Sequence, residues 1–238
     1  MGPRSLLWLN AQSGRSAELV HLLEWIKSDH LAWLLTFVND VSSPMGERAD
    51  MCIPIHAGQE ATLSTKTYTN MLAVNLLTAI QLSSGDVHEV RSAIQEMRAA
   101  ADAMETYLAN WEARVQELDS LLGEFDELFL IGRGSSMSAV WNGSLINKEA
   151  AKSAFEGMHA ADFRHGPLEL VSQGLAALVL PGSSQTSALN RDLAQEIVSY
   201  GGKAIWVDSS PDSEIPTIVL PKVVNWPARS LKSCQCKC

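Results

Sequence analysis

Cysteine is scarce in this chain of 238 residues, and its four cysteines are unevenly placed. Cys234, Cys236 and Cys238 lie within the last five residues, whereas Cys52 stands alone in an apolar run and is expected in the core. The terminal cysteines could bind a metal, but zinc sites normally use C-x2-4-C spacing, so an irregular tail is the simpler interpretation. The cysteine usage makes the cytoplasm the default compartment.

Long apolar runs and an excess of basic residues are also lacking. No run approaches the roughly 20 apolar residues of a membrane helix, and the apolar run near the N-terminus is too brief for a signal-peptide core. The 18 Lys and Arg against 27 Asp and Glu give a formal charge of -9, which argues against nucleic-acid binding. Small anions are not excluded as ligands, because backbone NH groups can hold them.

Strand-like apolar runs alternate with helical patterns along most of the chain. Parallel strands joined by helical crossovers follow from this alternation, so the sequence predicts a doubly wound α/β fold. The expected strands are 5–10, 31–38, 51–55, 128–131, 175–180 and 203–207, and helices are expected around 19–26, 72–80, 137–154 and 186–200. No clear element is predicted after Asp208.

The segment 86–122 has a different sequence pattern, with apolar residues at steps of three or four and no glycine or proline within it. This pattern predicts one long amphipathic helix or a tight pair of helices. A coiled-coil seam and ordinary globular packing both fit, and we favour a helical bridge between two halves that could serve in dimerisation. The apolar positions are Val87, Val90, Ile94, Met97, Ala101, Met104, Leu108, Trp111, Val115, Leu118 and Leu122.

Two groups of residues are candidates for chemistry. Gln12-Ser13-Gly14-Arg15-Ser16 lies where a strand meets a helix, and its NH groups and hydroxyls suit a phosphate. The alternative is an ordinary helix cap made by Ser13 or Ser16. In the second half, Glu149, Glu156 and His165 could provide proton transfer. From spacing alone the simpler interpretation is that Glu149 is a solvated helix residue and His165 a turn residue.

The motifs resemble those of the sugar isomerase (SIS) domain family, which includes the isomerase part of glucosamine-6-phosphate synthase and related amino-sugar-phosphate deaminases. Residues 11–18 are similar to the family's S-Q-S-G-E-T/S phosphate loop, and 57–67 resemble its A-G-x-E…S-T-K segment. Residues 140–149, Glu156 and Phe163-Arg-His-Gly-Pro167 resemble its A-L-K-x-K-E, H-A-E and R/K-H-G-P motifs in order. The similarity runs over about 7–208.

This resemblance implies a phosphosugar site and a reaction. The residues implied to bind phosphosugar are Gln12, Ser13, Ser16, Glu60, Ser64 and Thr65, with Lys66 and Glu156 in support. Glu149 would move the proton between C1 and C2 during aldose–ketose interconversion or deamination of an amino-sugar 6-phosphate. His165 would assist ring opening, typically in the partner subunit's site. The resemblance also implies a homodimer whose active sites are shared between subunits. No cofactor or metal is expected.

Several positions depart from the family pattern. Ala11 replaces the first serine of the phosphate loop, and Ile146 replaces a lysine associated with amino-sugar handling. The loop from Glu60 to Lys66 is one residue shorter. The family's opening strand has no counterpart before residue 5, and residues 225–234 match no family segment. A non-catalytic phosphosugar-binding module, or a damaged gene product, therefore stays open beside the enzyme.

The expected architecture is two flavodoxin-like, doubly wound parallel-sheet halves, each with three α/β/α layers, joined by a long helical segment. We expect the first half at 1–82, incomplete at its N-terminus, the helical linker at 83–122, the second half at 123–210 and an irregular tail at 211–238.

Overall fold

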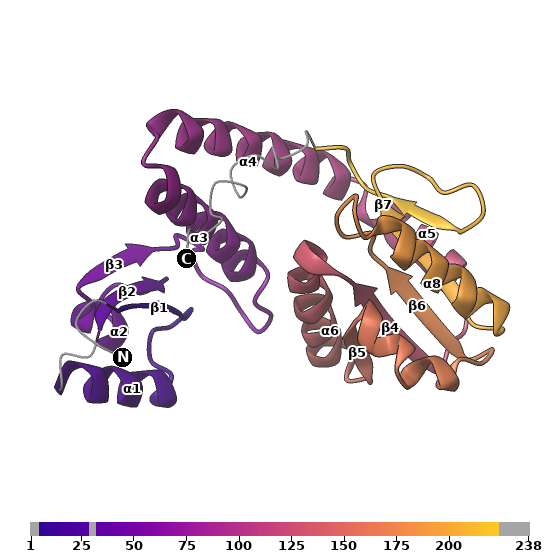
Figure 1. Cartoon of the computed structure of the whole chain (residues 1–238), viewed down its shortest axis with the longest axis horizontal. Coiled ribbons are helices and arrows are strands. Elements are labelled where there is room, and N and C mark those ends of the chain that lie inside the picture. Colours follow the sequence, from indigo (N-terminus) through magenta and orange to yellow (C-terminus); the bar gives the residue numbers. More distant parts are fainter. Residues whose placement is uncertain (1–4, 29–31, 224–238) are drawn as a thin grey trace. The chain divides into compact units, whose positions relative to one another are not determined.

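A computed structural model describes residues 5–28 and 32–223 of the chain (Figure 1). The chain divides into two compact units, with the boundary between Gln95 and Glu96. The four-part division expected from the sequence stays a prediction. No described helix is both long and apolar enough to cross a membrane.

The first unit is built on a three-stranded parallel sheet of order β1-β2-β3. Helices cover both of its faces, as expected for strands that are apolar on both sides. Leu23 and Ile26 of α1 and Met45 of α2 pack on one face, and Met71 and Val74 of α3 pack on the other. The elements are β1 (Leu6–Asn10), α1 (Ala17–Ser28), β2 (Trp33–Val38), α2 (Pro44–Arg48), β3 (Met51–Pro54) and α3 (Lys66–Ser84).

The segment between the sheets forms two helices, α4 (Val87–Leu108) and α5 (Trp111–Leu122). They are separated by a turn at Ala109 and Asn110. Of the two predicted alternatives, one long helix or a pair of helices, the structure therefore has the pair. Before α4, Gly85 ends α3 with a left-handed φ of 66°, a conformation that glycine adopts without steric cost.

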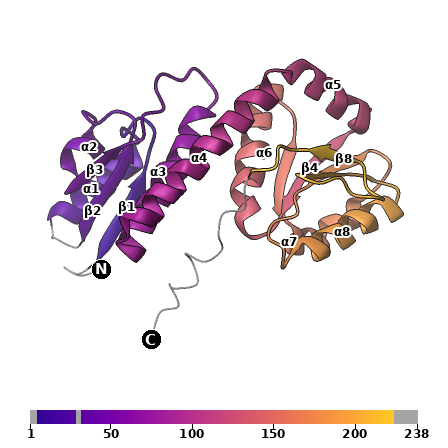
Figure 2. The same cartoon turned by 90° about the horizontal axis from the view of Figure 1, so that it is seen from above.

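The second unit contains a five-stranded parallel sheet of order β5-β4-β6-β7-β8. Figure 2 shows α5 and α6 on one face of it and α7 and α8 on the other, in agreement with the two apolar clusters that line the faces. The elements are β4 (Glu127–Gly132), η1 (Gly134–Ser136), α6 (Met137–Ala151), β5 (Phe155–His159), α7 (Ala160–Arg164), η2 (Pro167–Leu170), β6 (Leu175–Val179), α8 (Ser187–Ser199), β7 (Lys203–Asp208) and β8 (Thr217–Val219).

The predicted fold class, two parallel-sheet α/β halves, is confirmed, and two strands and one α-helix of the second half were missed. β5, α7 and β8 are only five, five and three residues long, too short to show a periodic apolar pattern. Helix α6 ends at Ala151 rather than near residue 154, because Lys152 adopts a left-handed φ of 55°.

The two units repeat one arrangement of strands and helices. In the first, β1, α1, β2 and β3 follow in the same order as β6, α8, β7 and β8 in the second. Within residues 5–28 and 32–223, β1 pairs only with β2, whereas its counterpart β6 lies between β4 and β7. The carboxyl ends of each set of parallel strands lie at one edge, where ligand sites of open α/β sheets are normally found.

Candidate functional site

Three loops meet at the carboxyl edge of the first sheet, and we call them the first loop cluster: residues 11–16 after β1, 39–43 after β2 and 57–65 after β3. Asn39 joins all three. Its amide NH donates to Gln12 O (2.9 Å), its Oδ1 accepts from Ala57 N (2.9 Å), and its Nδ2 donates to Gly58 O (2.7 Å). The cluster is therefore one hydrogen-bonded unit rather than three independent turns.

Gly14 lies at the centre of the predicted phosphate loop and packs closely on the loop after β2. Its φ is 65°, and a Cβ placed there would lie 2.0 Å from Ser43 Oγ. Only glycine fits this position, for both conformational and packing reasons. Gly14 O also accepts a hydrogen bond from Met45 N at 3.2 Å.

The charges at this edge are partly paired with one another. Arg15 Nη2 lies 2.8 Å from Asp40 Oδ2, and Ser42 donates to Asp40 Oδ1 from both its amide and its hydroxyl. The Ser42 hydroxyl first, and then Arg15, hold the pKa of Asp40 below its usual value. Sequence reasoning missed Asn39 and Asp40, although two polar residues directly after a buried strand are a usable signal.

The predicted site residues after β3 form a local hydrogen-bonded group. Glu60 accepts from Ser64 Oγ (3.1 Å) and from the amide of Lys66 (2.5 Å), while Lys66 Nζ donates to Gln59 O. Desolvation alone would raise the pKa of Glu60, but hydrogen bonds from Thr67, Lys66 and Ser64 outweigh it and lower this pKa. Thr65 precedes α3 and accepts from Thr69 N at 3.2 Å.

The hydroxyls of Ser13 and Ser16 are the groups of the first loop cluster best suited to an anion. Both residues are exposed, Ser13 Oγ accepts from Arg15 N at 3.2 Å, and Ser16 O accepts the first bond of α1 from Val20 N. A hydroxyl that rotates can still donate to an added acceptor. Together with the NH groups of the first turn of α1, which have no acceptor within the helix, these residues provide donors for a phosphate.

Glu149 and Glu156, in the second unit, lie near the amino edge of its sheet. Glu149 is exposed in the last turn of α6, and its neighbour Lys148 forms an ion pair of 2.9 Å with Glu156 of β5. The pair ties the end of α6 to the start of β5. Ile146, which replaces the family's lysine, is half-buried in the same turn.

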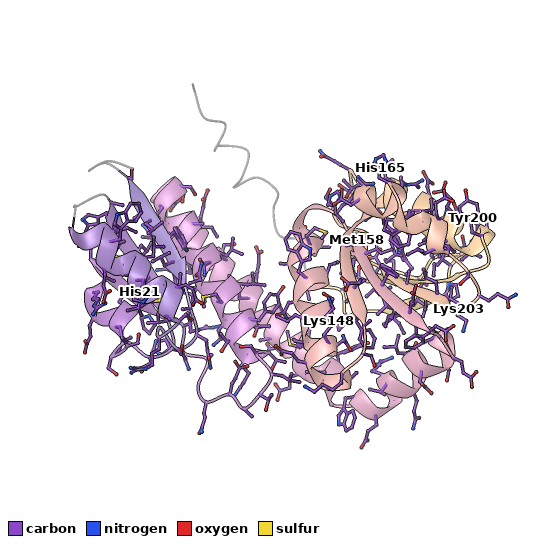
Figure 3. The ribbon with its side chains drawn as sticks, turned by 90° about the horizontal axis from the view of Figure 1, so that it is seen from below. His21, Lys148, Met158, His165, Tyr200 and Lys203 are labelled. Atoms are coloured by element: carbon purple, nitrogen blue, oxygen red, sulfur yellow. The ribbon has the colours of Figure 1, made fainter. Side chains whose placement is uncertain are left out.

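His165 lies at the opposite end of β5 from Glu149. It follows α7, is exposed, and donates its amide to Asp162 O at 3.0 Å. Figure 3 shows His165 and Lys148, the neighbour of Glu149, apart from each other in this unit, with Met158 of β5 labelled between them. At about 3.3 Å per residue, the strand from Phe155 to His159 alone spans roughly 13 Å. One copy of the second unit therefore does not bring Glu149 and His165 together.

A cavity of about 320 Å³ lies at the carboxyl edge of the second sheet. It has mostly apolar walls, including Leu180, Val207 and Leu220, and its polar members are Ser136, Asp208 and Ser209. None of the sequence-predicted site residues lines it. Among the residues that the structure describes, no group of three potential metal ligands occurs, and the terminal cysteines lie outside them.

Comparison with known proteins places the second unit in a family. The model of the SIS domain matches residues 122–217. This part of the chain is a SIS domain. The resemblance inferred from the motifs is thereby confirmed for the second unit.

Similarity to characterised sequences extends over almost the whole chain. The glutamine–fructose-6-phosphate aminotransferase (isomerizing) of Rhizobium leguminosarum bv. viciae is 28% identical over 94% of this chain. The enzyme of the same name from Pyrococcus horikoshii is 30% identical over 84% of the chain. The alignments take in only 39% and 33% of these two relatives.

Solved structures share the fold over both units. The C-terminal domain of glucosamine-fructose-6-phosphate aminotransferase from Francisella tularensis superposes with a TM-score of 0.75 and 21% identity, covering 91% of this chain and 63% of that one. Tagatose-6-phosphate ketose/aldose isomerase from Escherichia coli gives a TM-score of 0.75 at 18% identity, over 98% and 66% of the two chains. Glucosamine-6-phosphate deaminase from Thermotoga maritima gives 0.72 at 18%, over 92% and 65%.

Proposed function

We propose that the chain binds a sugar phosphate and catalyses aldose–ketose isomerisation or deamination of an amino-sugar 6-phosphate. The observation that carries the proposal is the first loop cluster, in which Ser13 and Ser16 present hydroxyls at the carboxyl edge of a parallel sheet. The phosphate binds to these hydroxyls, to Gln12 and to the start of α1, while Glu60, Ser64 and Thr65 shape the neighbouring loop, with Lys66 in support. Relatives and structural neighbours named for 6-phosphosugar reactions support this assignment.

Glu149 acts as the base that moves a proton between C1 and C2, and Glu156 supports it through Lys148. His165 assists ring opening. Because Glu149 and His165 lie at opposite ends of β5, each active site takes its glutamate from one copy and its histidine from another. The functional form is accordingly a homodimer, and the reaction takes place in the cytoplasm without a cofactor.

Calorimetry and turnover assays test the two parts of this proposal separately. Replacing both Ser13 and Ser16 by alanine should weaken binding of fructose 6-phosphate and glucosamine 6-phosphate at least about tenfold, since charge-assisted hydrogen bonds are lost. Ser120→Ala on α5, which removes a hydroxyl bonded only to Gln116 O among described residues, is the matched control. Equal affinities in both variants would contradict a phosphate site at residues 12–16.

A non-catalytic phosphosugar-binding module is the second candidate. Ala11 and Ile146, which replace a phosphate-loop serine and a lysine one helical turn before the glutamate, favour it. The distinguishing measurement is formation of ketose, aldose or ammonia from the two sugar phosphates by wild-type protein and by Glu149→Gln. Binding that is unaffected by Glu149→Gln, with no product from wild type, would support the binding module over the enzyme.

A further inference from the structure

The second sheet, of order β5-β4-β6-β7-β8, changes its direction of winding between β4 and β6. From β4 the chain crosses to β5 through α6 on one face, whereas from β6 it crosses to β7 through α8 on the opposite face. The loops after β4 and β6 therefore leave in opposite directions and form a crevice at the carboxyl edge, where doubly wound sheets bind their ligands. The cavity of about 320 Å³ lies at this crevice, because Ser136, Pro181 and Gly182 of the two loops line it.

Arg133, in the loop after β4, brings a positive charge to the crevice. Its Nε donates to Oδ1 of Asn190 at 2.9 Å, and Asn190, fully buried in α8, donates from Nδ2 to Leu180 O at 2.7 Å. The two loops are also in close contact, since a Cβ at Gly182 would lie 2.8 Å from Arg133 O. The Nη1 and Nη2 groups of Arg133 have no hydrogen-bond partner anywhere in residues 5–28 and 32–223. The guanidinium is therefore fixed through one nitrogen and keeps two for a ligand, in the planar arrangement that matches phosphate oxygens.

A carboxylate lines the same cavity at the end of β7. Asp208 is half-buried, and its Oδ1 accepts from the amide of Ser209 at 2.6 Å. Its Oδ2 accepts no hydrogen bond from any residue that the structure describes. An ionised carboxylate only accepts hydrogen bonds, so Asp208 suits a part of the ligand that donates them, such as the hydroxyls of a sugar ring. An acidic side chain holds the ribose hydroxyl in this way in dinucleotide-binding folds.

The character of the carboxyl edge changes in the order of its strands. The cation follows β4, the carboxylate ends β7, and after β8 the cavity wall is apolar, with Leu220, Pro221 and Val223. Adjacent strands lie about 4.8 Å apart, so the distance from β4 to β8 is roughly 14 Å. A hexose phosphate ends in hydroxyls and would leave the apolar part unfilled. A phosphate, a ribose and a flat heterocyclic base in series match all three parts.

We propose that this crevice binds a nucleoside monophosphate, with the phosphate on Arg133, the ribose hydroxyls on Asp208 and the base against the apolar wall after β8. The nucleotide is a second ligand of the chain and not the sugar phosphate of the proposed function. None of the residues proposed to bind or act on that sugar phosphate lines the cavity, so the two sites can be tested separately.

Calorimetry with AMP and UMP on the full chain tests the site. We expect at least one of them to bind to the wild-type protein. Arg133→Gln, which keeps a donor for Asn190, should weaken this binding by about tenfold or more, because a charge-assisted contact to phosphate is lost. The matched control is Arg114→Gln on α5, which removes an exposed arginine outside the cavity and should leave the affinity unchanged.

The ribose contact has its own measurement. Wild-type protein should bind the ribonucleotide more tightly than its 2′-deoxy form, and Asp208→Asn should reduce this preference. This comparison of two ligands on one folded variant carries the test if Arg133→Gln lowers the melting temperature more than Arg114→Gln does.

Three results would overturn the proposal: no binding of either nucleotide to wild type, equal weakening in Arg133→Gln and Arg114→Gln, or ribose 5-phosphate binding as tightly as AMP. The last result would mean that the apolar wall holds no base. The variant with both Ser13 and Ser16 replaced by alanine should bind the nucleotide as wild type does. Loss of fructose 6-phosphate binding in that variant therefore reports on the proposed function alone.

Discussion

Arg15 and Asp40 join the loops after β1 and β2, with 2.8 Å between Nη2 and Oδ2. The ion pair holds the cationic side chain beside the two serines proposed to bind phosphate. Both side chains are exposed, so the pair itself contributes little to the free energy of unfolding. Its consequence is electrostatic, because it fixes how much positive charge a phosphate meets at this loop.

Neutralising Asp40 should therefore raise the affinity for phosphate, whereas neutralising Arg15 should lower it. Asp40→Asn keeps an acceptor for Ser42 and releases Arg15, so affinity for fructose 6-phosphate should rise about two- to fivefold. Arg15→Met should lower it by a similar factor. Calorimetry at low and high salt measures both, and the differences should shrink as salt increases. Weaker binding in both variants would mean that the pair acts as a scaffold instead.

Gly14→Ala should destabilise the first unit and remove phosphate binding. The substitution forces a residue with Cβ into a left-handed conformation and places that Cβ 2.0 Å from Ser43 Oγ. We expect a loss of about 2–4 kcal/mol in the free energy of unfolding, measured with urea.

Gly58→Ala is the control for this change. Gly58 has a similar φ of 70°, but a Cβ there meets nothing within 4 Å, so only conformational strain of about 1–2 kcal/mol is expected. The difference between the two variants measures the close packing of Gly14 on Ser43. Equal destabilisation would show that the loops after β1 and β2 do not pack as described.

Asp212 should make the second unit sensitive to acid. Its carboxylate accepts from Arg191 Nε at 2.6 Å and from the amides of Glu214 and Ile215, and these bonds, Arg191 first, lower its pKa to about 2. Because the folded-state pKa lies below the unfolded value of about 3.9, the stabilisation is complete above pH 4 and is lost as the pH falls toward 2.

Asp212→Asn should cost about 1–2 kcal/mol at pH 7, and the difference from wild type should decrease between pH 4 and pH 3. Urea unfolding across this range measures it. Asp50→Asn, whose carboxylate accepts from Leu34 N in the other unit, is a control for general acid effects. A cost for Asp212→Asn that does not change with pH would contradict the assigned ion pair.

The sequence predicts the strands that are buried on both faces, because they form continuous apolar runs. It predicts the helices that are buried on one face, because their apolar residues recur at regular spacing. It does not predict β5, whose five residues include Glu156 and Gly157 and carry no such pattern. That omission matters for the site. Without a strand between them, Glu149 and His165 can be imagined to converge, whereas β5 places them at opposite ends of the sheet.

The first loop cluster shows the same limit at the level of side chains. Ser13 and Ser16 are predicted from a loop motif that is local in sequence. Asn39 joins three loops through contacts with residues up to 27 positions away, and these exist only once the three strands are aligned. A single sequence therefore offers a candidate anion-binding loop, but it does not predict what holds that loop in place.

The separation of Glu149 and His165 leads to a complementation experiment. If each site combines a glutamate from one copy with a histidine from the other, Glu149→Gln and His165→Asn should each be inactive alone. Mixed after unfolding and refolding together, they should recover activity, since half of the dimers are mixed and each mixed dimer has one intact site. The expected recovery is about a quarter of the wild-type rate.

The matched control for this mixture pairs Glu149→Gln with a chain that carries both substitutions. Mixed dimers of those two contain no intact site, so they should stay inactive, and any recovery seen there would have to come from incomplete inactivation. No recovery in the first mixture, while wild type treated in the same way regains its rate, would contradict shared sites. In that case either something other than a second copy of the chain brings Glu149 and His165 together, or His165 has no part in ring opening.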